Sequence, residues 1–161
     1  MTEKVNEVKP PRGLARIFYR FPILLYRVGL GWLLGERALM MMHTGRISGL
    51  ARRVVLEVMR HDRDTDTYIV ASGWGEKSDW FQNISKTPQV EVTVGRRCFS
   101  ALAQRLPLDE AYEEVQDYAR RHPTAIRQLG RLIGYQLEHT PEGYRALVGV
   151  MPIVAIRPVE Q

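Results

Sequence analysis

The chain has 161 residues, of which 45% are hydrophobic and 25% charged, the proportions of one ordinary globular domain. It carries 23 Lys and Arg against 18 Asp and Glu, a net charge of +5, and most of the basic residues are Arg. This charge suits an anionic ligand, an anionic membrane surface or nucleic acid, and does not choose among them. The single cysteine, Cys98, excludes a disulfide within the chain and fits a reducing compartment.

The N-terminal part begins polar and then becomes strongly apolar. Residues 1–11 are predicted to be a disordered lead without a signal-peptide cleavage pattern, so we expect a cytoplasmic protein. An apolar and basic helix is predicted over 12–38, because three arginines recur four residues apart: Arg12, Arg16 and Arg20. Such a helix either caps the core or lies on an anionic bilayer. Peripheral contact with the inner face of the membrane through 12–35 therefore stays open.

Short alternating segments predict a mostly antiparallel β-structure. Strands are expected at 39–43, 53–59, 68–72, 90–94, 98–105 and 153–156. Helices are expected at 79–84, 108–121 and 124–134. The turns are tight and no βαβ spacing is present, which excludes a doubly wound sheet. The fold class is therefore α+β, a small antiparallel β-barrel with flanking helices, in a single domain over 12–161.

Several catalytic classes lack their sequence signatures. The chain contains no HExxH, Walker A, GxGxxG or GxSxG pattern. The four histidines are widely spaced, and each is more typical of a surface or core residue than of a catalyst or ligand: His43, His61, His122 and His139. We therefore expect no metal and no nucleic-acid partner, and no residue can be named as catalytic.

The segment Thr44–Arg53 has the chemistry of an anion-binding turn. Its two glycines allow successive backbone N–H groups to face an anion, and the hydroxyls of Thr44 and Ser48 add donors. The guanidinium groups of Arg46 and Arg52 can clamp a phosphate or carboxylate. A plain hairpin loop with solvated arginines explains the same residues equally well.

A second segment, Ala71–Asn83, passes from a strand end through glycines into a short helix. Helix N-termini attract anions, and the aromatic residues Trp80 and Phe81 can bracket a flat ring. Alternatively Trp80, Phe81 and Ile84 pack the helix onto the core, and for Trp80 alone this packing is favoured. Together the two segments predict a pocket for a flat, phosphate-bearing anion.

The stretches TGRISGLAR, ASGWGEKSDWFQN and PQVEVTV, in this order, resemble the deazaflavin-dependent nitroreductase family, which has a split β-barrel fold. The resemblance runs from Arg12 to Pro158. It implies coenzyme F-420, an 8-hydroxy-5-deazaflavin, and hydride transfer to a small-molecule acceptor such as an activated alkene, quinone or nitroaromatic. The alternatives are an FMN-dependent split-barrel reductase and a non-catalytic binder of an anionic cofactor or lipid. A monomer and a homodimer are both compatible.

The resemblance also implies which residues bind the coenzyme. The loop that holds the phosphate and glutamyl tail corresponds to Arg46, Ile47, Ser48 and Arg52, followed by Arg53, Val54 and Val55. The wall that holds the deazaflavin ring corresponds to Val70, Ala71, Ser72, Gly73, Asp79, Trp80, Phe81, Gln82 and Asn83. Ile47 stands where the family commonly has Lys.

Overall fold

A computed structural model describes residues 3–4, 24–25, 28–132 and 135–160. The chain divides into two compact units. We call the first the barrel unit, and it comprises residues 11–70, 79–104 and 155–161. The second, the helical unit, comprises residues 1–10, 71–78 and 105–154.

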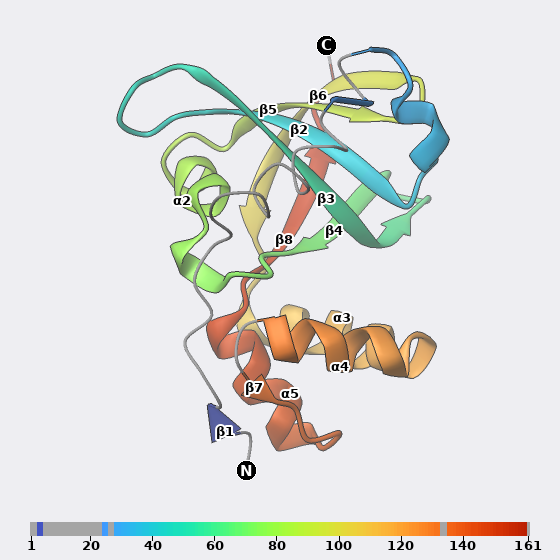
Figure 1. Cartoon of the computed structure of the whole chain (residues 1–161), viewed down its shortest axis with the longest axis vertical. Coiled ribbons are helices and arrows are strands. Elements are labelled where there is room, and N and C mark those ends of the chain that lie inside the picture. The colour runs from blue at the N-terminus through green and yellow to red at the C-terminus, as the bar shows by residue number, and fades with distance from the viewer. Residues whose placement is uncertain (1–2, 5–23, 26–27, 133–134, 161) are drawn as a thin grey trace. The chain divides into compact units, whose positions relative to one another are not determined.

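Six strands close into a barrel in the order β2-β3-β4-β8-β6-β5 (Figure 1). The strands are β2 (Ala38–Thr44), β3 (Ala51–Asp62), β4 (Thr67–Ala71), β5 (Gln89–Val94), β6 (Arg97–Arg105) and β8 (Ile153–Pro158). Helix α2 (Asp79–Lys86) precedes β5, and a 3-10 turn, η1 (Gly31–Leu34), precedes β2. The predicted antiparallel barrel with flanking helices is confirmed.

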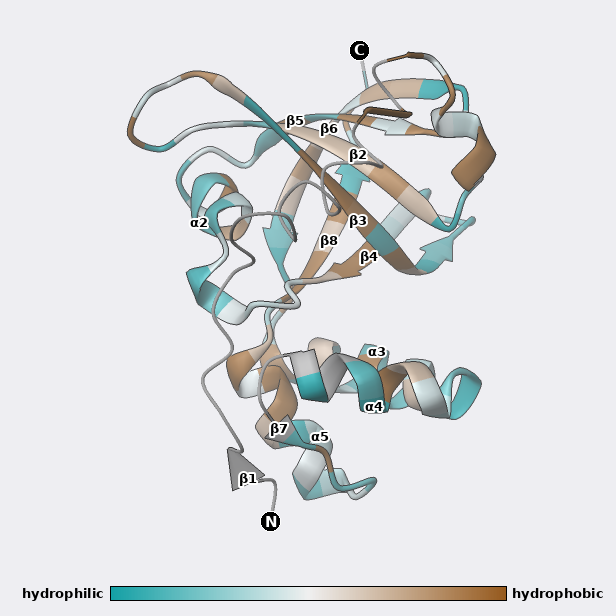
Figure 2. Cartoon of the chain, viewed as in Figure 1, coloured by the Kyte–Doolittle hydropathy of each residue, from teal (hydrophilic) through white to brown (hydrophobic). Residues whose placement is uncertain are grey.

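The barrel encloses a core of inward apolar side chains: in β2 and β5 these alternate with more exposed outward residues, whereas β4 and β8 are buried along most of their length. In β2, Leu39 and Met41 are fully buried and His43 is 5% exposed, whereas the residues between them are partly exposed. Val90, Val92 and Val94 repeat this pattern in β5. Figure 2 shows the resulting hydrophobic stretches along β3 and β8. His43 is thus the last inward-facing residue of β2 before the hairpin loop.

The helical unit contains α3 (Leu108–Arg121), α4 (Pro123–Leu132), α5 (Pro141–Val150) and the 3-10 turn η2 (Gly75–Lys77). It also contains the short antiparallel pair β1 (Glu3–Lys4) and β7 (Tyr135–Gln136). Helix α3 has acidic residues in its first turn and arginines in its last, which complements the helix dipole. The sequence analysis did not predict α5, η2 or the β1–β7 pair.

The predicted N-terminal helix lies largely outside the described residues, which exclude 12–23 and 26–27. In the described remainder, residues 24–25 are helical, and η1 follows between Gly29 and Gly35, whose φ angles of 78° and 59° do not continue a helix. The stretch 28–38 is therefore a turn, a 3-10 turn and the start of β2. The predicted lead 1–11 is described only at residues 3–4. No helix in the described part of the chain is long and apolar enough to span a membrane.

Helix α5 contains two glycines with opposite expected responses to substitution. A Cβ on Gly143 would lie 2.2 Å from the carbonyl oxygen of Glu138, whereas a Cβ on Gly149 would meet nothing within 4 Å. We expect Gly143→Ala to lower the free energy of unfolding by about 1–3 kcal/mol through overpacking. Gly149→Ala should raise it by up to about 1 kcal/mol through helix propensity. Urea unfolding of both variants tests this, and equal effects would contradict the packing around Gly143.

Candidate functional site

Within the barrel unit, the β2–β3 loop is fixed to helix α2 through Arg46. The backbone N–H of Arg46 and its guanidinium Nη1 each donate to Asn83 Oδ1 at 3.0 Å. The guanidinium also donates from both Nη atoms to Asp79 Oδ1 at 3.1 Å. On the other side, Lys86 Nζ donates to the carbonyl oxygen of Arg46 at 2.8 Å. Three residues of α2 therefore hold one residue of the loop.

Asn83 connects this loop to the barrel interior. Its side chain is almost fully buried, at 4% exposed for the residue, and its Nδ2 lies 3.1 Å from Nδ1 of His43. Because Oδ1 already accepts two N–H groups from Arg46, Nδ2 must be the donor toward His43. His43 Nδ1 is therefore an acceptor, and the imidazole proton lies on Nε2.

Burial keeps His43 neutral. Desolvation is the main cause that lowers its pKa from 6.5 to about 4, with the nearby Arg52 guanidinium acting in the same direction and the Asp79 carboxylate opposing both. The direction agrees with the hydrogen-bond pattern, since a protonated Nδ1 would face the Asn83 amide donor. His43 was treated in the sequence analysis as an ordinary core or surface residue, and the structure instead joins it to two predicted site residues.

The loop itself has the compact geometry that an anion-binding turn requires. The N–H of Gly49 donates to the carbonyl of Gly45 at 2.8 Å, and the N–H of Leu50 donates to Ser48 Oγ at 3.2 Å. A Cβ on Gly45 would lie 2.7 Å from Ser48 Oγ and 3.3 Å from the carbonyl oxygen of Leu50, so a larger residue there would displace the Ser48 hydroxyl. Neither the N–H of Ile47 nor that of Ser48 donates to any residue in the described ranges.

The residues that follow the loop alternate between the two faces of the hairpin. Arg52 is paired in register with His43, and Val54 with the buried Met41, so both lie on the inward-facing side of β3. Arg53 is paired with Met42, and Val55 with Met40, so both lie on the opposite face. Arg52 is exposed, and its guanidinium has neither a hydrogen bond nor an ion pair with a residue that the structure describes. Of these predicted site residues, Arg52 and Val54 therefore share the His43 face.

The predicted ring-binding residues fall into two groups. Val70 is fully buried in the barrel unit, whereas Ala71, Ser72 and Gly73 belong to the helical unit. Ser72 is fully buried and donates from its hydroxyl to the carbonyl of Gly75 at 2.6 Å. Its single proton is thereby used, so the Ser78 hydroxyl, 2.7 Å away, donates to Ser72 Oγ. Ser72 therefore stabilises the turn that contains η2.

Helix α2 turns its aromatic residues toward the core. Trp80 and Phe81 are each 7% exposed, and their rings make an edge-to-face contact with centroids 6.1 Å apart. Gln82 is half-buried, and Asp79 is exposed apart from its contact with Arg46. The described exposures favour the packing interpretation of Trp80 and Phe81 over that of a bracket for a flat ring.

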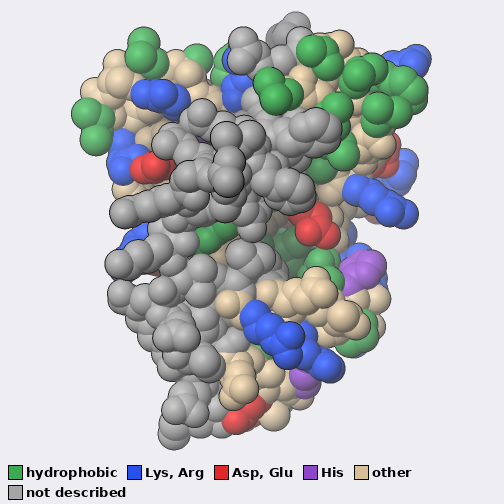
Figure 3. Space-filling model, in the orientation of Figure 1, with side chains coloured by type: hydrophobic (Ala, Val, Ile, Leu, Met, Phe, Trp, Pro, Cys, Tyr) green, Lys and Arg blue, Asp and Glu red, His purple; other side chains and the backbone are tan. Residues whose placement is uncertain are grey.

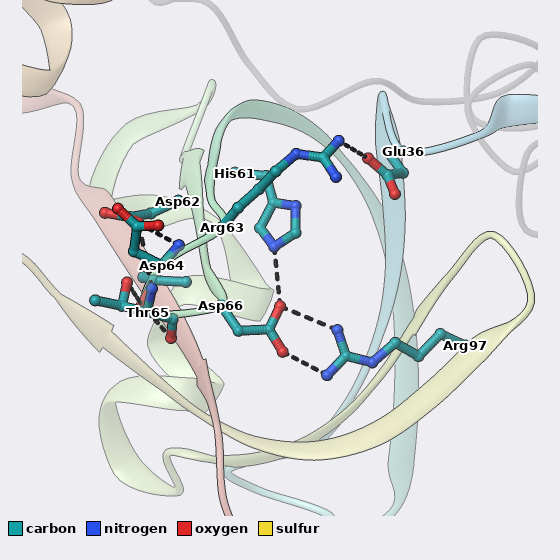
Figure 4. Close-up of polar contacts among 9 residues, drawn as sticks. Glu36, His61, Asp62, Arg63, Asp64, Thr65, Asp66 and Arg97 are labelled. Carbon is teal, nitrogen blue, oxygen red and sulfur yellow. Dashed lines mark hydrogen bonds and ion pairs between the residues drawn. The ribbon is translucent and has the colours of Figure 1, made fainter.

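A second polar cluster lies at the β3–β4 turn of the barrel unit (Figure 4). The carboxylate of Asp66 accepts both Nη groups of Arg97 and the Nε2–H of His61, the latter at 2.9 Å. The hydrogen bond from Arg97 is the main cause that lowers the pKa of Asp66 to about 2. The His61 ring stacks on Tyr68 at 3.9 Å, and its Nδ1 is buried without a hydrogen-bond partner among the described residues. The cluster fixes Asp66 at a left-handed φ of 51° and so stabilises the turn.

The loop and α2 together are suited to an anion. The loop and the start of β3 carry Arg46, Arg52 and Arg53, and α2 contributes one carboxylate, Asp79, and one cation, Lys86, in contact with Arg46. Arg46 is largely neutralised by Asp79, which leaves Arg52 and the N–H groups of Ile47 and Ser48 as available donors. In the described part of the chain, no group of His, Cys, Asp or Glu is arranged to hold a metal ion. These features are those of a closed-barrel protein whose β2–β3 loop is suited to bind an anion.

Comparison with known families identifies that class more closely. Residues 26–139 match the F420H2-dependent quinone reductase family, so the chain belongs to this family. It is therefore an oxidoreductase, and its cofactor is coenzyme F-420. No protein of curated function matches the sequence.

Solved structures share the barrel at low sequence identity. An F420H2-dependent reductase, FDR-A, is 16% identical over 77% of this chain and 96% of its own, with a TM-score of 0.54. A structure described as a domain-swapped dimer is 16% identical over 84% and 99%, with a TM-score of 0.53. HutZ, a heme storage protein from Vibrio cholerae, is 12% identical over 85% and 92%, with a TM-score of 0.54. At these identities the likeness shows the fold alone, and the fold serves different chemistry.

The coenzyme's anionic part fits the residues of the loop. The tail of coenzyme F-420 is polyanionic, and among the described residues the loop offers two unpartnered N–H groups and the unpaired guanidinium of Arg52. Backbone N–H groups in a tight turn and a fork-shaped guanidinium are typical phosphate and carboxylate donors.

The buried, neutral His43 predicts a pH dependence of stability. Its pKa is 6.5 in the unfolded chain and about 4 in the folded one, so the unfolded state binds the proton first as pH falls. We expect the free energy of unfolding to fall between pH 6.5 and 4, with up to about 3 kcal/mol of the change due to His43. In urea unfolding at several pH values, the free energy of unfolding of His43→Asn should decrease less between pH 6.5 and 4 than that of the unmodified protein. His122→Asn, a change at an exposed histidine, is the matched control. An equal pH dependence of the free energy of unfolding in the unmodified protein and in both variants would contradict a buried, neutral His43.

Proposed function

We propose that this protein binds coenzyme F-420 at the β2–β3 loop and catalyses reduction of an electron-poor acceptor. The acceptor classes are quinones, activated alkenes and nitroaromatics, and the family description favours a quinone. When bound in its reduced form, the coenzyme supplies a hydride, and uptake of one proton completes a two-electron reduction. The protein's part is to hold the coenzyme and the acceptor close together in the orientation that hydride transfer requires, and to exclude water.

The observation that carries this proposal is the anchored loop. Arg46 is held by three residues of α2, so the N–H groups of Ile47 and Ser48 are presented from a fixed turn. Arg52 adds a cation on the face that carries His43. The contacts of the deazaflavin ring with residues 70–73 and 79–83 are implied by the family resemblance and remain part of the proposal.

Binding of the coenzyme can be measured without knowledge of the acceptor. We expect coenzyme F-420 at 100 times its Kd to stabilise the protein by about 2.7 kcal/mol in thermal unfolding, and FMN to stabilise it much less. Oxidation of the reduced coenzyme in the presence of a soluble quinone then tests turnover. Stabilisation by FMN alone would assign a flavin enzyme, and binding without turnover of any acceptor class would favour a non-catalytic binding protein.

Arg52 and Arg53 provide a matched pair of variants for the same experiment. Both are exposed neighbours on β3, and their register places them on opposite faces of the hairpin. Loss of a charge-assisted hydrogen bond in Arg52→Gln should weaken coenzyme binding by about tenfold or more, whereas Arg53→Gln should change it little. The reverse order would place the coenzyme on the other face of β3.

We also propose peripheral contact with an anionic membrane through residues 12–35. Hydrophobic side chains gather over η1 (Figure 3). Five large hydrophobic residues in and before η1 are exposed: Leu24, Val28, Leu30, Trp32 and Leu33. The guanidinium of Arg96 lies 5.4 Å from the centroid of the Trp32 ring. The sequence from 12 to 35 contains no acidic residue. Apolar side chains beside arginines are typical of surfaces that bind anionic lipids.

Vesicle sedimentation tests the membrane contact. The protein should sediment with phosphatidylglycerol vesicles more than with phosphatidylcholine vesicles, and Leu33→Asp should reduce this. Leu108→Asp, a change at an exposed leucine of the helical unit, is the control and should behave as the unmodified protein. If the unmodified protein does not sediment with either vesicle, the membrane contact is wrong, and the coenzyme assignment is unaffected.

A further inference from the structure

We propose that His43 is a positioning residue for coenzyme binding, which acts by fixing the orientation of the Asn83 side-chain amide. This inference rests on the proposed binding of the coenzyme's anionic tail at the β2–β3 loop. It adds a residue that neither the sequence motifs nor the family resemblance assigned to the site. His43 is joined to the loop by a chain of hydrogen bonds from His43 Nδ1 to Asn83 and from Asn83 to Arg46.

The amide of Asn83 has two possible orientations, and only one supports the loop. With Oδ1 toward Arg46, it accepts both the backbone N–H and the guanidinium of Arg46 at 3.0 Å. A reversed amide would place its NH2 group against those two donors. The acceptor at His43 Nδ1 stabilises the orientation with Oδ1 toward Arg46, because the buried Asn83 NH2 group then has a hydrogen-bond partner.

The chemistry of imidazole suits this position. His43 is the last inward residue of β2, so its ring closes the barrel core while Nδ1 points at Asn83. Being neutral, it offers a lone pair without placing a buried positive charge beside the guanidinium groups of Arg46 and Arg52. Removal of that lone pair leaves a buried amide donor unpaired and frees Asn83 to rotate. The N–H groups of Ile47 and Ser48 would then lose their fixed direction.

Three substitutions separate the possible roles of the two ring nitrogens. His43→Asn places an oxygen acceptor near the position of Nδ1 and removes the donor at Nε2. His43→Gln reaches toward the position of Nε2 and lacks the acceptor beside the backbone. His43→Leu introduces an apolar side chain of similar bulk and lacks both the acceptor at Nδ1 and the donor at Nε2. His122→Asn changes an exposed histidine of the helical unit and serves as the control.

The first measurement is the Kd for oxidised coenzyme F-420, obtained by fluorescence titration of each folded variant. We expect His43→Leu and His43→Gln to bind about three- to tenfold more weakly than the unmodified protein, the effect of one lost hydrogen bond. His43→Asn and His122→Asn should bind as the unmodified protein does. Tight binding by His43→Gln with weak binding by His43→Asn would overturn the proposal, because it would show that Nε2 acts directly as a donor.

The second measurement needs no coenzyme. Amide hydrogen exchange of residues 44–50 should be faster in His43→Leu than in the unmodified protein and should return to normal in His43→Asn. If the unmodified protein does not bind the coenzyme, the proposed function fails, and the exchange result still tests whether His43 orders the loop. If it binds and His43→Leu matches it in both affinity and exchange, the positioning role is wrong.

Discussion

The candidate site depends on the hydrogen bonds of one side-chain amide, that of Asn83. It is buried, and its oxygen and nitrogen serve different elements: the oxygen holds Arg46 in the loop, and the nitrogen bonds to His43 in β2. A buried polar group must have hydrogen-bond partners. The amide therefore fixes the positions of the loop and β2, and their hydrogen bonds in turn fix the orientation of the amide. Because β2, the loop and α2 meet at this one side chain, the turn has a defined shape before any ligand binds.

The fold contributes rigidity to this arrangement. The loop joins two strands that pair without interruption from Thr44 and Ala51 to Ala38 and Glu57. Helix α2 is held in place by its buried face, which carries Trp80, Phe81 and Ile84. A loop that carries a binding site is most effective when the elements on both sides do not move. The barrel is therefore a support, which explains how the same architecture serves a heme storage protein and a deazaflavin reductase.

Much of the fold could be predicted from the sequence because its signals are local. The alternation of Val90, Val92 and Val94 predicted β5, and the charges at the two ends of 108–121 predicted α3, whose bounds the structure reproduces. Helix α5 was missed although its start had a local signal. Thr140 caps the helix by accepting the N–H of Gly143, and Pro141 follows it. A search for that capping pattern would have found it.

The contacts of the site were harder to predict because they join distant residues. Arg46 and Asn83 are 37 positions apart, and His43 and Asn83 are 40 apart. Both motifs were recognised as candidate site segments, but no pattern in a single sequence states that the arginine of one is bound by the helix of the other. The same limit explains why His43 was set aside, since an isolated histidine has no local partner that would mark it.

The ion pair between Arg46 and Asp79 changes how anion recognition at this site must be understood. From composition alone, the abundance of arginine suggests that charge attracts the ligand. In the structure, one of the two arginines expected to clamp the anion is bound to a carboxylate and an amide, so it shapes the loop instead. In the proposed binding mode, the anion is held by fixed N–H dipoles and by Arg52, whose side chain has no carboxylate partner among the described residues. Dipoles held in place by the protein do not have to reorganise when an anion arrives, and this is more effective than a mobile charge in water. The polar network around Asn83 is what keeps those dipoles in place.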